Sequence, residues 1–180
     1  MSKLGYKELF YFSLPSILSS LLEPISSVVD TAFIGQLNSE WLASLAVGTS
    51  LLNTFTWMFN FLIHVTIQSI ADARTQDSVE HFSRKIKVSF ICALIVGICG
   101  SLILFLVKDY LYDWMNVSKT LSIFVDSYFA PRVLFYFMSL LFVTLISMLR
   151  GIEKVREAFF LVFITTLINI FLTFLFLNVF

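Results

Sequence analysis

Charged residues are scarce in this chain of 180 residues: 13% are Asp, Glu, Lys or Arg, against 58% hydrophobic residues. A typical soluble domain carries about 25% charged residues, so the deficit excludes an ordinary water-soluble protein. Residues 41–71, 88–107 and 158–180 contain none of these four residue types. Since roughly 20 apolar residues in a helix cross about 30 Å of hydrocarbon, each stretch predicts a transmembrane helix. We therefore expect an all-α integral membrane protein surrounded by a lipid bilayer.

Cysteine is also rare, and the two cysteines cannot form a disulfide with each other. Cys92 and Cys99 lie seven residues apart in one apolar stretch, and seven residues of helical rise separate their α-carbons by about 10 Å. The sequence also lacks a glycine-rich phosphate loop, a His/Cys set with metal-ligand spacing and a catalytic triad pattern. We expect no enzyme, no cofactor, no structural metal and no nucleic-acid partner.

Two further apolar segments bring the predicted membrane helices to five. The predicted ranges are about 9–36, 41–71, 86–107, 129–149 and 157–180. Pro15 and Pro24 predict bends in the first helix, because proline removes a backbone hydrogen bond that neighbouring helices can replace. Between the helices, the polar residues from Ala73 to Lys87 predict a solvated loop. The mixture of aromatic residues and aspartates over 108–128 predicts short helical pieces along the outer surface.

The basic residues fall mostly on one side of the predicted membrane. If the N-terminus is cytoplasmic, the inner segments hold nine of the 12 Lys and Arg residues and the outer segments hold three. Cytoplasmic loops carry an excess of Lys and Arg, so we expect a cytoplasmic N-terminus in a multi-pass protein of the bacterial inner (plasma) membrane. The inner residues are Lys3, Lys7, Arg74, Arg84, Lys85, Lys87, Arg150, Lys154 and Arg156, and the outer residues are Lys108, Lys119 and Arg132.

The last predicted helix reaches Phe180 with no polar residues after it to anchor its end. An odd number of helices with a bare apolar end favours a truncated reading frame over a small complete membrane protein. We expect the polypeptide to be part of a larger one.

Two carboxylates lie within the first apolar segment. Glu23 and Asp30 are seven residues apart, a rotation about 20° short of two full helical turns, so they share one face of the helix. A carboxylate in the hydrocarbon core costs at least about 2.5 kcal/mol, which makes intramembrane acids functional-site candidates by default. The alternative is structural: Asp30 would bond to a helix break near Pro24, and Glu23 to a neighbouring helix.

Neutral polar residues in two other predicted helices also recur with the period of one helix face. In the second helix we expect this face to point into the bundle, either to pack helices together or to line a cavity, with His64 as a packing residue or a proton relay. In the fifth helix the polar side would complete a cation site or bond helix to helix. The first set is Asn53, Thr56, Trp57, Asn60, His64 and Gln68, and the second is Thr165, Thr166, Asn169 and Thr173.

One stretch resembles the opening two helices of multidrug and toxic compound extrusion (MATE) transporters. It runs from Leu14 to Asn60 and reads LPSILSSLLEPISSVVDTAFIGQLNSEWLASLAVGTSLLNTFTWMFN. Its details are similar to the DinF-type branch of the family. These details are Glu23-Pro24, Asp30-Thr31, Ile34-Gly35-Gln36-Leu37, Leu42-Ala43 and the Gly48-Thr49-Ser50 run.

The resemblance implies a drug or metabolite antiporter of twelve helices in two six-helix lobes, which exchanges an organic, often cationic, substrate for protons or Na⁺. This chain would supply helices one to five of the first lobe. The family's cation site uses an aspartate on the first helix, matched by Asp30, and an Asn-x-x-x-Asp pair on the fifth, which here reads Asn169 and Thr173. A proton carrier needs only one carboxylate, whereas a Na⁺ site would lose a negative oxygen. Proton coupling is therefore favoured.

Two alternatives to the antiporter remain open at this stage. A related flippase of lipid-linked saccharides should line its cavity with several basic residues, and only Arg132 sits at the edge of a predicted helix. A non-transporting fragment or small assembly protein is the other reading, because alternating access needs a second repeat for the first to move against. We expect transport to require the missing second lobe or a separate chain.

Overall fold

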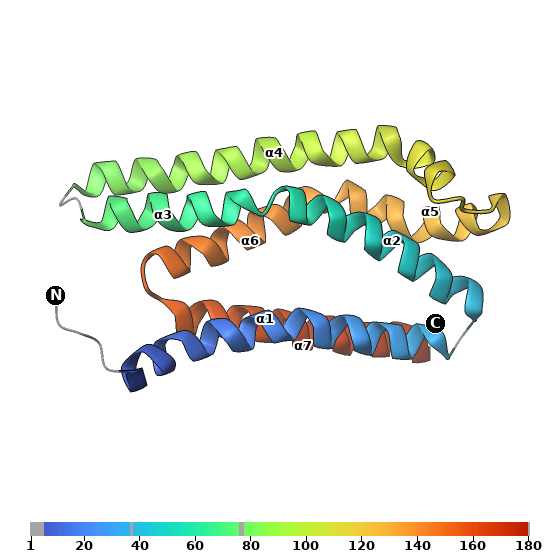
Figure 1. The fold of residues 1–180 in the computed structure, drawn as a ribbon, viewed down its shortest axis with the longest axis horizontal. Helices are drawn as coiled ribbons and strands as arrows, with labels where there is room; N and C mark the ends of the chain where they lie inside the picture. The colour runs from blue at the N-terminus through green and yellow to red at the C-terminus, as the bar shows by residue number, and fades with distance from the viewer. Residues whose placement is uncertain (1–5, 37, 76–77, 180) are drawn as a thin grey trace.

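The computed structural model describes residues 6–36, 38–75 and 78–179, and it contains helices and no strand in those ranges (Figure 1). The all-α prediction is therefore confirmed. The helices are α1 (Tyr6–Gly35), α2 (Ser39–Met58), α3 (Phe61–Thr75), α4 (Val79–Trp114), α5 (Lys119–Leu134), α6 (Tyr136–Gly151) and α7 (Val155–Val179).

Four helical segments are long and apolar enough to cross a membrane. They are Ser13–Gly35, Ser39–Thr75, Val79–Trp114 and Val155–Phe176. The bent pair α5–α6, with an angle of 50° between its two helices, makes a fifth if it acts as one span. The helix lengths and composition thus agree with the predicted multi-pass membrane protein.

The helices extend further than predicted, because they continue into the polar segments between the apolar stretches and are capped there by polar side chains. The stretch from Ala73 to Lys87 is not a loop: α3 continues to Thr75, and α4 begins at Val79. The Ser78 side chain accepts a hydrogen bond from the His81 N–H and caps α4, which satisfies a donor that a helix start leaves free.

The predicted surface helices of residues 108–128 are also absent. The end of α4 and the start of α5 form a helical hairpin instead, which turns at Asn116 with a φ of 53°. Ser118 caps α5 by accepting from the Leu121 N–H. An ion pair between Lys108 and Asp126 joins the two arms of the hairpin. Charged residues here extend the helices rather than interrupt them.

The breaks between helices do not coincide with the two prolines of the first helix, and the bends predicted there stay a prediction. Pro15 and Pro24 both lie inside α1, which runs through them uninterrupted. The breaks are instead at Phe59 and Asn60, between α2 and α3, and at Phe135, between α5 and α6. The Phe59 N–H lies near three carbonyl oxygens of the last turn of α2. Such bonds tighten the last turn of a helix, as is common where a helix ends.

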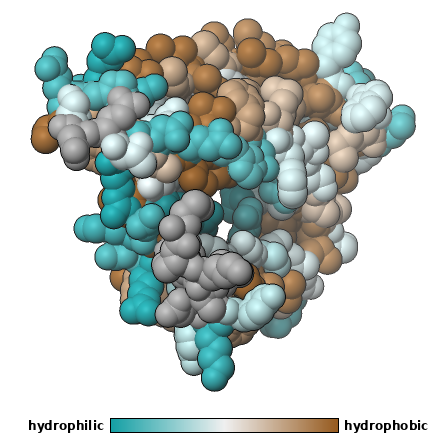
Figure 2. All heavy atoms as spheres, turned by 60° about the vertical axis from the view of Figure 1, so that its left-hand side comes forward, coloured by the Kyte–Doolittle hydropathy of each residue, from teal (hydrophilic) through white to brown (hydrophobic). Residues whose placement is uncertain are grey.

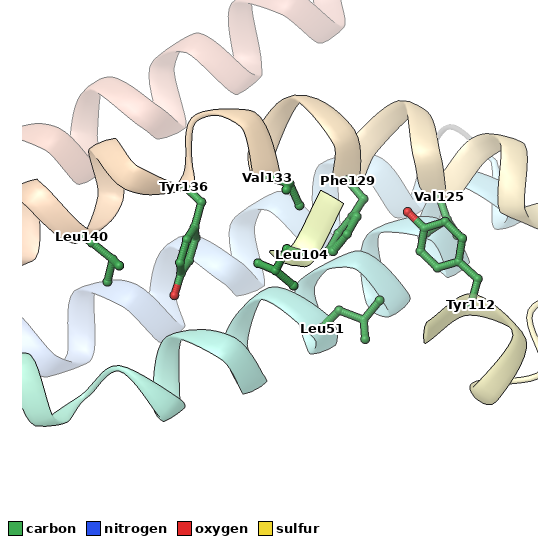
Figure 3. Close-up of a cluster of buried hydrophobic side chains, with 8 residues drawn as sticks. All are labelled: Leu51, Leu104, Tyr112, Val125, Phe129, Val133, Tyr136 and Leu140. Carbon is green, nitrogen blue, oxygen red and sulfur yellow. The ribbon is translucent and has the colours of Figure 1, made fainter. Parts of the chain in front are cut away.

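Helices α2 to α6 form the packed body of the molecule. Helix α6 packs against α3 and α4, and α5 packs against α2 and α4. Their shared core is apolar and largely excluded from solvent (Figure 3). It contains Leu51, Leu104, Tyr112, Val125, Phe129, Val133, Tyr136 and Leu140.

Close helix contact inside the body depends on a glycine at one position in particular. A Cβ added at Gly97 of α4 would lie 2.7 Å from the Cα of Phe137 on α6. Only a residue without a side chain lets the two backbones approach so closely, as is common where membrane helices pack.

Helices α1 and α7 form a pair of their own beside this body (Figure 1). They lie along each other, and they join the body where α1 meets α2 and where α7 meets α6. Their most apolar windows are only 6% and 0% buried, against 28% for the α2–α3 window. The α1–α7 pair is therefore held mainly by its own contacts.

The end of the molecule where α6 turns into α7 is hydrophilic. Figure 2 shows hydrophilic residues gathered around a hollow at this end, with hydrophobic residues covering the side above it. Arg74 at the end of α3 donates to the Ile152 carbonyl oxygen at 2.8 Å and pairs with Glu153 at 2.9 Å. These contacts fix the α6–α7 turn to the body.

Candidate coupling-ion site between α1 and α7

Two side-chain hydrogen bonds connect the C-terminal halves of α1 and α7. The Thr173 hydroxyl donates to the Asp30 carboxylate at 3.1 Å. The Ser26 hydroxyl donates to the Asn169 side-chain oxygen at 3.1 Å. All three residues named as the coupling-ion site from sequence, Asp30, Asn169 and Thr173, therefore lie at this one interface.

The spacing of these bonds shows how the two helices align. Each joins residues 143 positions apart, so α1 and α7 run parallel with a constant register over one helical turn. Residues four apart lie on the same face of a helix, which brings Ser26 and Asp30 opposite Asn169 and Thr173. Further along, the rings of Phe33 and Phe174 approach to 6.0 Å and continue the contact in apolar form.

Asp30 is half-buried at this interface, and no cation of the protein pairs with it among the described residues. Thr173 also is half-buried and offers a neutral hydroxyl where the family pattern has a second acid. The site thus consists of one carboxylate, two hydroxyls and an amide. In the parts of the chain that the structure describes, no group of three or more His, Cys, Asp or Glu side chains comes together.

Several other hydroxyls on these two helices bond to their own helix. Ser19 donates to the Pro15 carbonyl oxygen at 2.8 Å, and Thr165 donates to Leu161 at 2.9 Å. Such bonds to the preceding turn satisfy a hydroxyl without any partner on another helix. The hydroxyls of Ser26 and Thr173 differ from these, because they bond to a side chain on another helix.

Glu23, the second acid of α1, is exposed and has no partner among the described residues. The structure therefore does not support the alternative in which it bonds to a neighbouring helix within this chain. It shares α1 with Asp30, yet the two side chains make no common contact. Whether it has an accessory role stays a prediction.

The polar face predicted on the second helix does not point into the packed body. Asn53, His64 and Gln68 are exposed, and within the described residues they have no hydrogen-bond partner. Asn60 is half-buried at the break between α2 and α3. The opposite side of these helices, with Leu51, Leu62, Thr66 and Ile70, carries the buried residues instead. Asn53, His64 and Gln68 therefore do not bond to other helices among the described residues, and the alternative in which this face lines a cavity stays a prediction.

Thr56 is the exception on that face. It donates to the Leu52 carbonyl oxygen at 2.8 Å and accepts from the Tyr136 hydroxyl at 3.5 Å. It belongs to the body rather than to a polar surface.

Tyr128 of α5 is a half-buried residue to which the sequence analysis gave no role. Its hydroxyl lies 3.3 Å from the Thr49 hydroxyl of α2. Arg132, one turn further along α5, lies over the Tyr128 ring at 4.3 Å. A Cβ at Gly48 would lie 2.6 Å from that ring, so the glycine on α2 makes room for it. An aromatic residue in an apolar helix gave no signal of this role.

Comparison with known proteins relates this chain to one family of membrane proteins. The MatE family profile matches residues 15–175. Protein DETOXIFICATION 44, chloroplastic, from Arabidopsis thaliana is 34% identical over 127 residues, which cover 65% of this chain and 24% of that protein. The probable multidrug resistance protein NorM from Acinetobacter baylyi is 26% identical over 116 residues, which cover 64% of this chain and 26% of that protein.

The matched region is a small part of these relatives. The chain spans about a quarter of the length of each. No solved structure matches the chain.

Proposed function

Because the chain belongs to the MatE family, we propose that it forms part of a secondary antiporter for efflux of an organic, cationic substrate. The observation that carries the proposal is the hydrogen bond from Thr173 to Asp30 beside Asn169. Relatives named for detoxification and multidrug resistance support the direction and the substrate class. The local details between Leu14 and Asn60 support the DinF-type branch.

We propose protons rather than Na⁺ as the coupling ion. Asp30 is the single carboxylate at the α1–α7 interface, and Thr173 provides a neutral donor to it. One carboxylate is enough to carry a proton, whereas a hard cation is held by several oxygen ligands. Proton uptake at Asp30 would weaken the hydrogen bond from Thr173, because a protonated carboxyl accepts less strongly than a carboxylate does.

Transport further requires a second helical unit. The relatives are about four times longer than the matched region, and alternating access works by movement of one repeat against another. The exposed polar residues of α2 and α3, above all Asn53, His64 and Gln68, would then face the cavity between the two units. A second unit in the same polypeptide or in a separate chain would serve.

The test is efflux of a fluorescent organic cation by cells that express the chain together with its second unit. We expect extrusion that rises with an inward proton gradient and is lost in Asp30→Asn. Asp113→Asn is the matched control, because Asp113 is an exposed carboxylate at the outer end of α4. Proton-driven extrusion that persists in Asp30→Asn would overturn the assignment of Asp30.

We also propose that the N-terminus is cytoplasmic, which places the α4–α5 turn outside. The biased distribution of Lys and Arg supports this orientation. Asn116 lies exposed at the tip of that turn. In a variant with Cys92 and Cys99 replaced by alanine, Asn116→Cys should react with an impermeant maleimide added to intact cells. Reaction only after the cells are opened would reverse the orientation.

A further inference from the structure

The Asn169 amide is held in one orientation by a residue outside the predicted site. Its side-chain oxygen accepts from the Ser26 hydroxyl at 3.1 Å. An amide has its oxygen and its NH₂ group on different sides of one carbon, so an oxygen that faces Ser26 leaves the NH₂ group facing away from it. In the described part of the chain, that NH₂ group has no partner.

Ser26 is one turn before Asp30 on α1, just as Asn169 is one turn before Thr173 on α7. The amide oxygen is thus engaged at the level of Ser26, one helical turn before the bond between Thr173 and Asp30. Among the neutral groups at the interface, that amide oxygen is the strongest candidate ligand for a bound cation, since hard cations prefer carboxylate and carbonyl oxygens. Thr173 meanwhile directs its hydrogen at Asp30.

Other charged groups do not replace this oxygen. The elements packed against α1 are α7 and α2. The charged residues of α7 lie at its start, and Glu40 lies in the first turn of α2, ten residues after Asp30 and beyond the end of α1. On α1 itself Glu23 is two turns away. The charged residues in question are Glu40 on α2 and Arg156 and Glu157 on α7.

We propose that Ser26 is a positioning residue that makes the site select protons over Na⁺, by holding the Asn169 oxygen away from Asp30. The proposal rests on the coupling role assigned to Asp30 above. A proton binds to the carboxylate alone and needs no further ligand. A Na⁺ ion must replace its water shell with protein oxygens, and Ser26 removes one of the few that are present.

The experiment measures Na⁺ binding to the full chain in lipid nanodiscs at alkaline pH, as a Na⁺-specific rise in thermal stability with choline chloride as the ionic-strength control. A ligand that binds only the folded state raises its stability in proportion to its affinity. Wild-type protein should show no difference between the two salts. Ser26→Ala frees the amide to rotate and should gain Na⁺ affinity by about tenfold, the scale that one hydrogen bond allows.

Three variants show whether the gain comes from the amide. Ser26→Thr keeps the hydroxyl and should behave as wild type. Ser27→Ala is the matched control, because Ser27 is an exposed serine of α1 that is not at the interface bond. Asp30→Asn combined with Ser26→Ala should abolish the gain. If Ser26→Ala does not fold, Ser26→Cys, with a weak thiol donor of similar size, replaces it.

Two results would overturn the proposal: wild-type protein that already responds to Na⁺, or a folded Ser26→Ala protein with no Na⁺-specific response. In the second case Ser26 serves only to join two helices. A failure of the proposed function gives a different result. In the efflux assay, extrusion would then not depend on the proton gradient, or Asp30→Asn would have no effect on it, independently of the Na⁺ response in the stability measurement.

Discussion

The α1–α7 pair and the body of α2 to α6 are held together in different ways. In the body, large apolar side chains such as Phe129 and Leu104 are fully buried. In the pair, the most apolar windows are 6% and 0% buried within the chain, and two polar bonds mark the contact. Membrane interhelical hydrogen bonds contribute only about 0.6 kcal/mol each. The helices that carry the candidate ion site are thus the less firmly fixed of the two regions.

This difference fits a division of labour. A site that must bind and release a proton while helices move benefits from weak, exchangeable contacts. A body that must keep its shape benefits from close packing, which changes little without a large loss of free energy. Substitutions in the two regions should therefore have unequal effects on stability, and the following expectations run from the largest effect to the smallest.

Phe129→Ala should lower the free energy of unfolding the most, by about 3–5 kcal/mol, because it leaves a cavity in the core of the body. Unfolding in mixed detergent micelles, followed by helical circular dichroism, gives the value. Phe171→Ala is the control: Phe171 lies on α7 and is 60% exposed, so lipid fills its place. Equal losses for both would mean that the two regions do not differ in packing.

Gly97→Ala should destabilise by about 1–3 kcal/mol through overpacking. The new Cβ would lie 2.7 Å from the Phe137 backbone, so α4 and α6 must separate. In Gly35→Ala, at the end of α1, the nearest atoms belong to the Leu42 side chain at 3.7 Å, and no loss is expected. The same unfolding measurement applies. If Gly97→Ala causes no loss of stability, α4 and α6 can move apart without cost and the packing of the body is not tight there.

Thr173→Val keeps the shape of the side chain but removes the donor to Asp30. We expect a loss of about 0.6 kcal/mol in stability, in line with one interhelical hydrogen bond in a membrane. Thr165→Val is the control, since Thr165 bonds to carbonyl oxygens of its own helix. In a double-mutant cycle with Asp30→Asn, the two single losses should not add. Full additivity would show that the bond does not form in the membrane.

The smallest effect is expected where the two regions meet at the α6–α7 turn. Arg74 and Glu153 pair at 2.9 Å with side chains 50% and 69% exposed. Solvent and salt screen such a pair, so its coupling in a double-mutant cycle should be at most about 0.5 kcal/mol and should shrink at high salt. A coupling above the Thr173 value would make this turn, rather than the polar bonds, the main attachment of α7.

Sequence reasoning located the central residues of the site but not their setting. Asp30 stands out because a carboxylate in an apolar helix is costly, and Asn169 and Thr173 stand out through the family pattern. Ser26 did not, although it is four residues before Asp30, because serines are frequent in α1 and some of them, such as Ser19 and Ser20, bond only to their own backbone. Tyr128 was missed for a similar reason: its ring belongs to an apolar pattern, and its hydroxyl matters only beside Thr49.

The direction of a polar face was also beyond the sequence. The recurrence of Asn53, His64 and Gln68 identifies one side of a helix, yet either side may be the one that packs. The breaks at Phe59 and Phe135 had no proline at the break itself to announce them, whereas Pro15 and Pro24 interrupt nothing. In each case the outcome depends on neighbours that are remote in the sequence.

The sequence by itself determined that this protein lies in a lipid bilayer and approximately how many membrane helices it has. It also identified Asp30 as the acid most in need of a partner. These follow from hydropathy and desolvation cost, which add up residue by residue along a segment. Only the tertiary structure decided that α1 runs parallel to α7 in the register that joins Ser26 to Asn169 and Asp30 to Thr173. Register between helices 143 residues apart is set by how both pack together, and no local pattern contains that information.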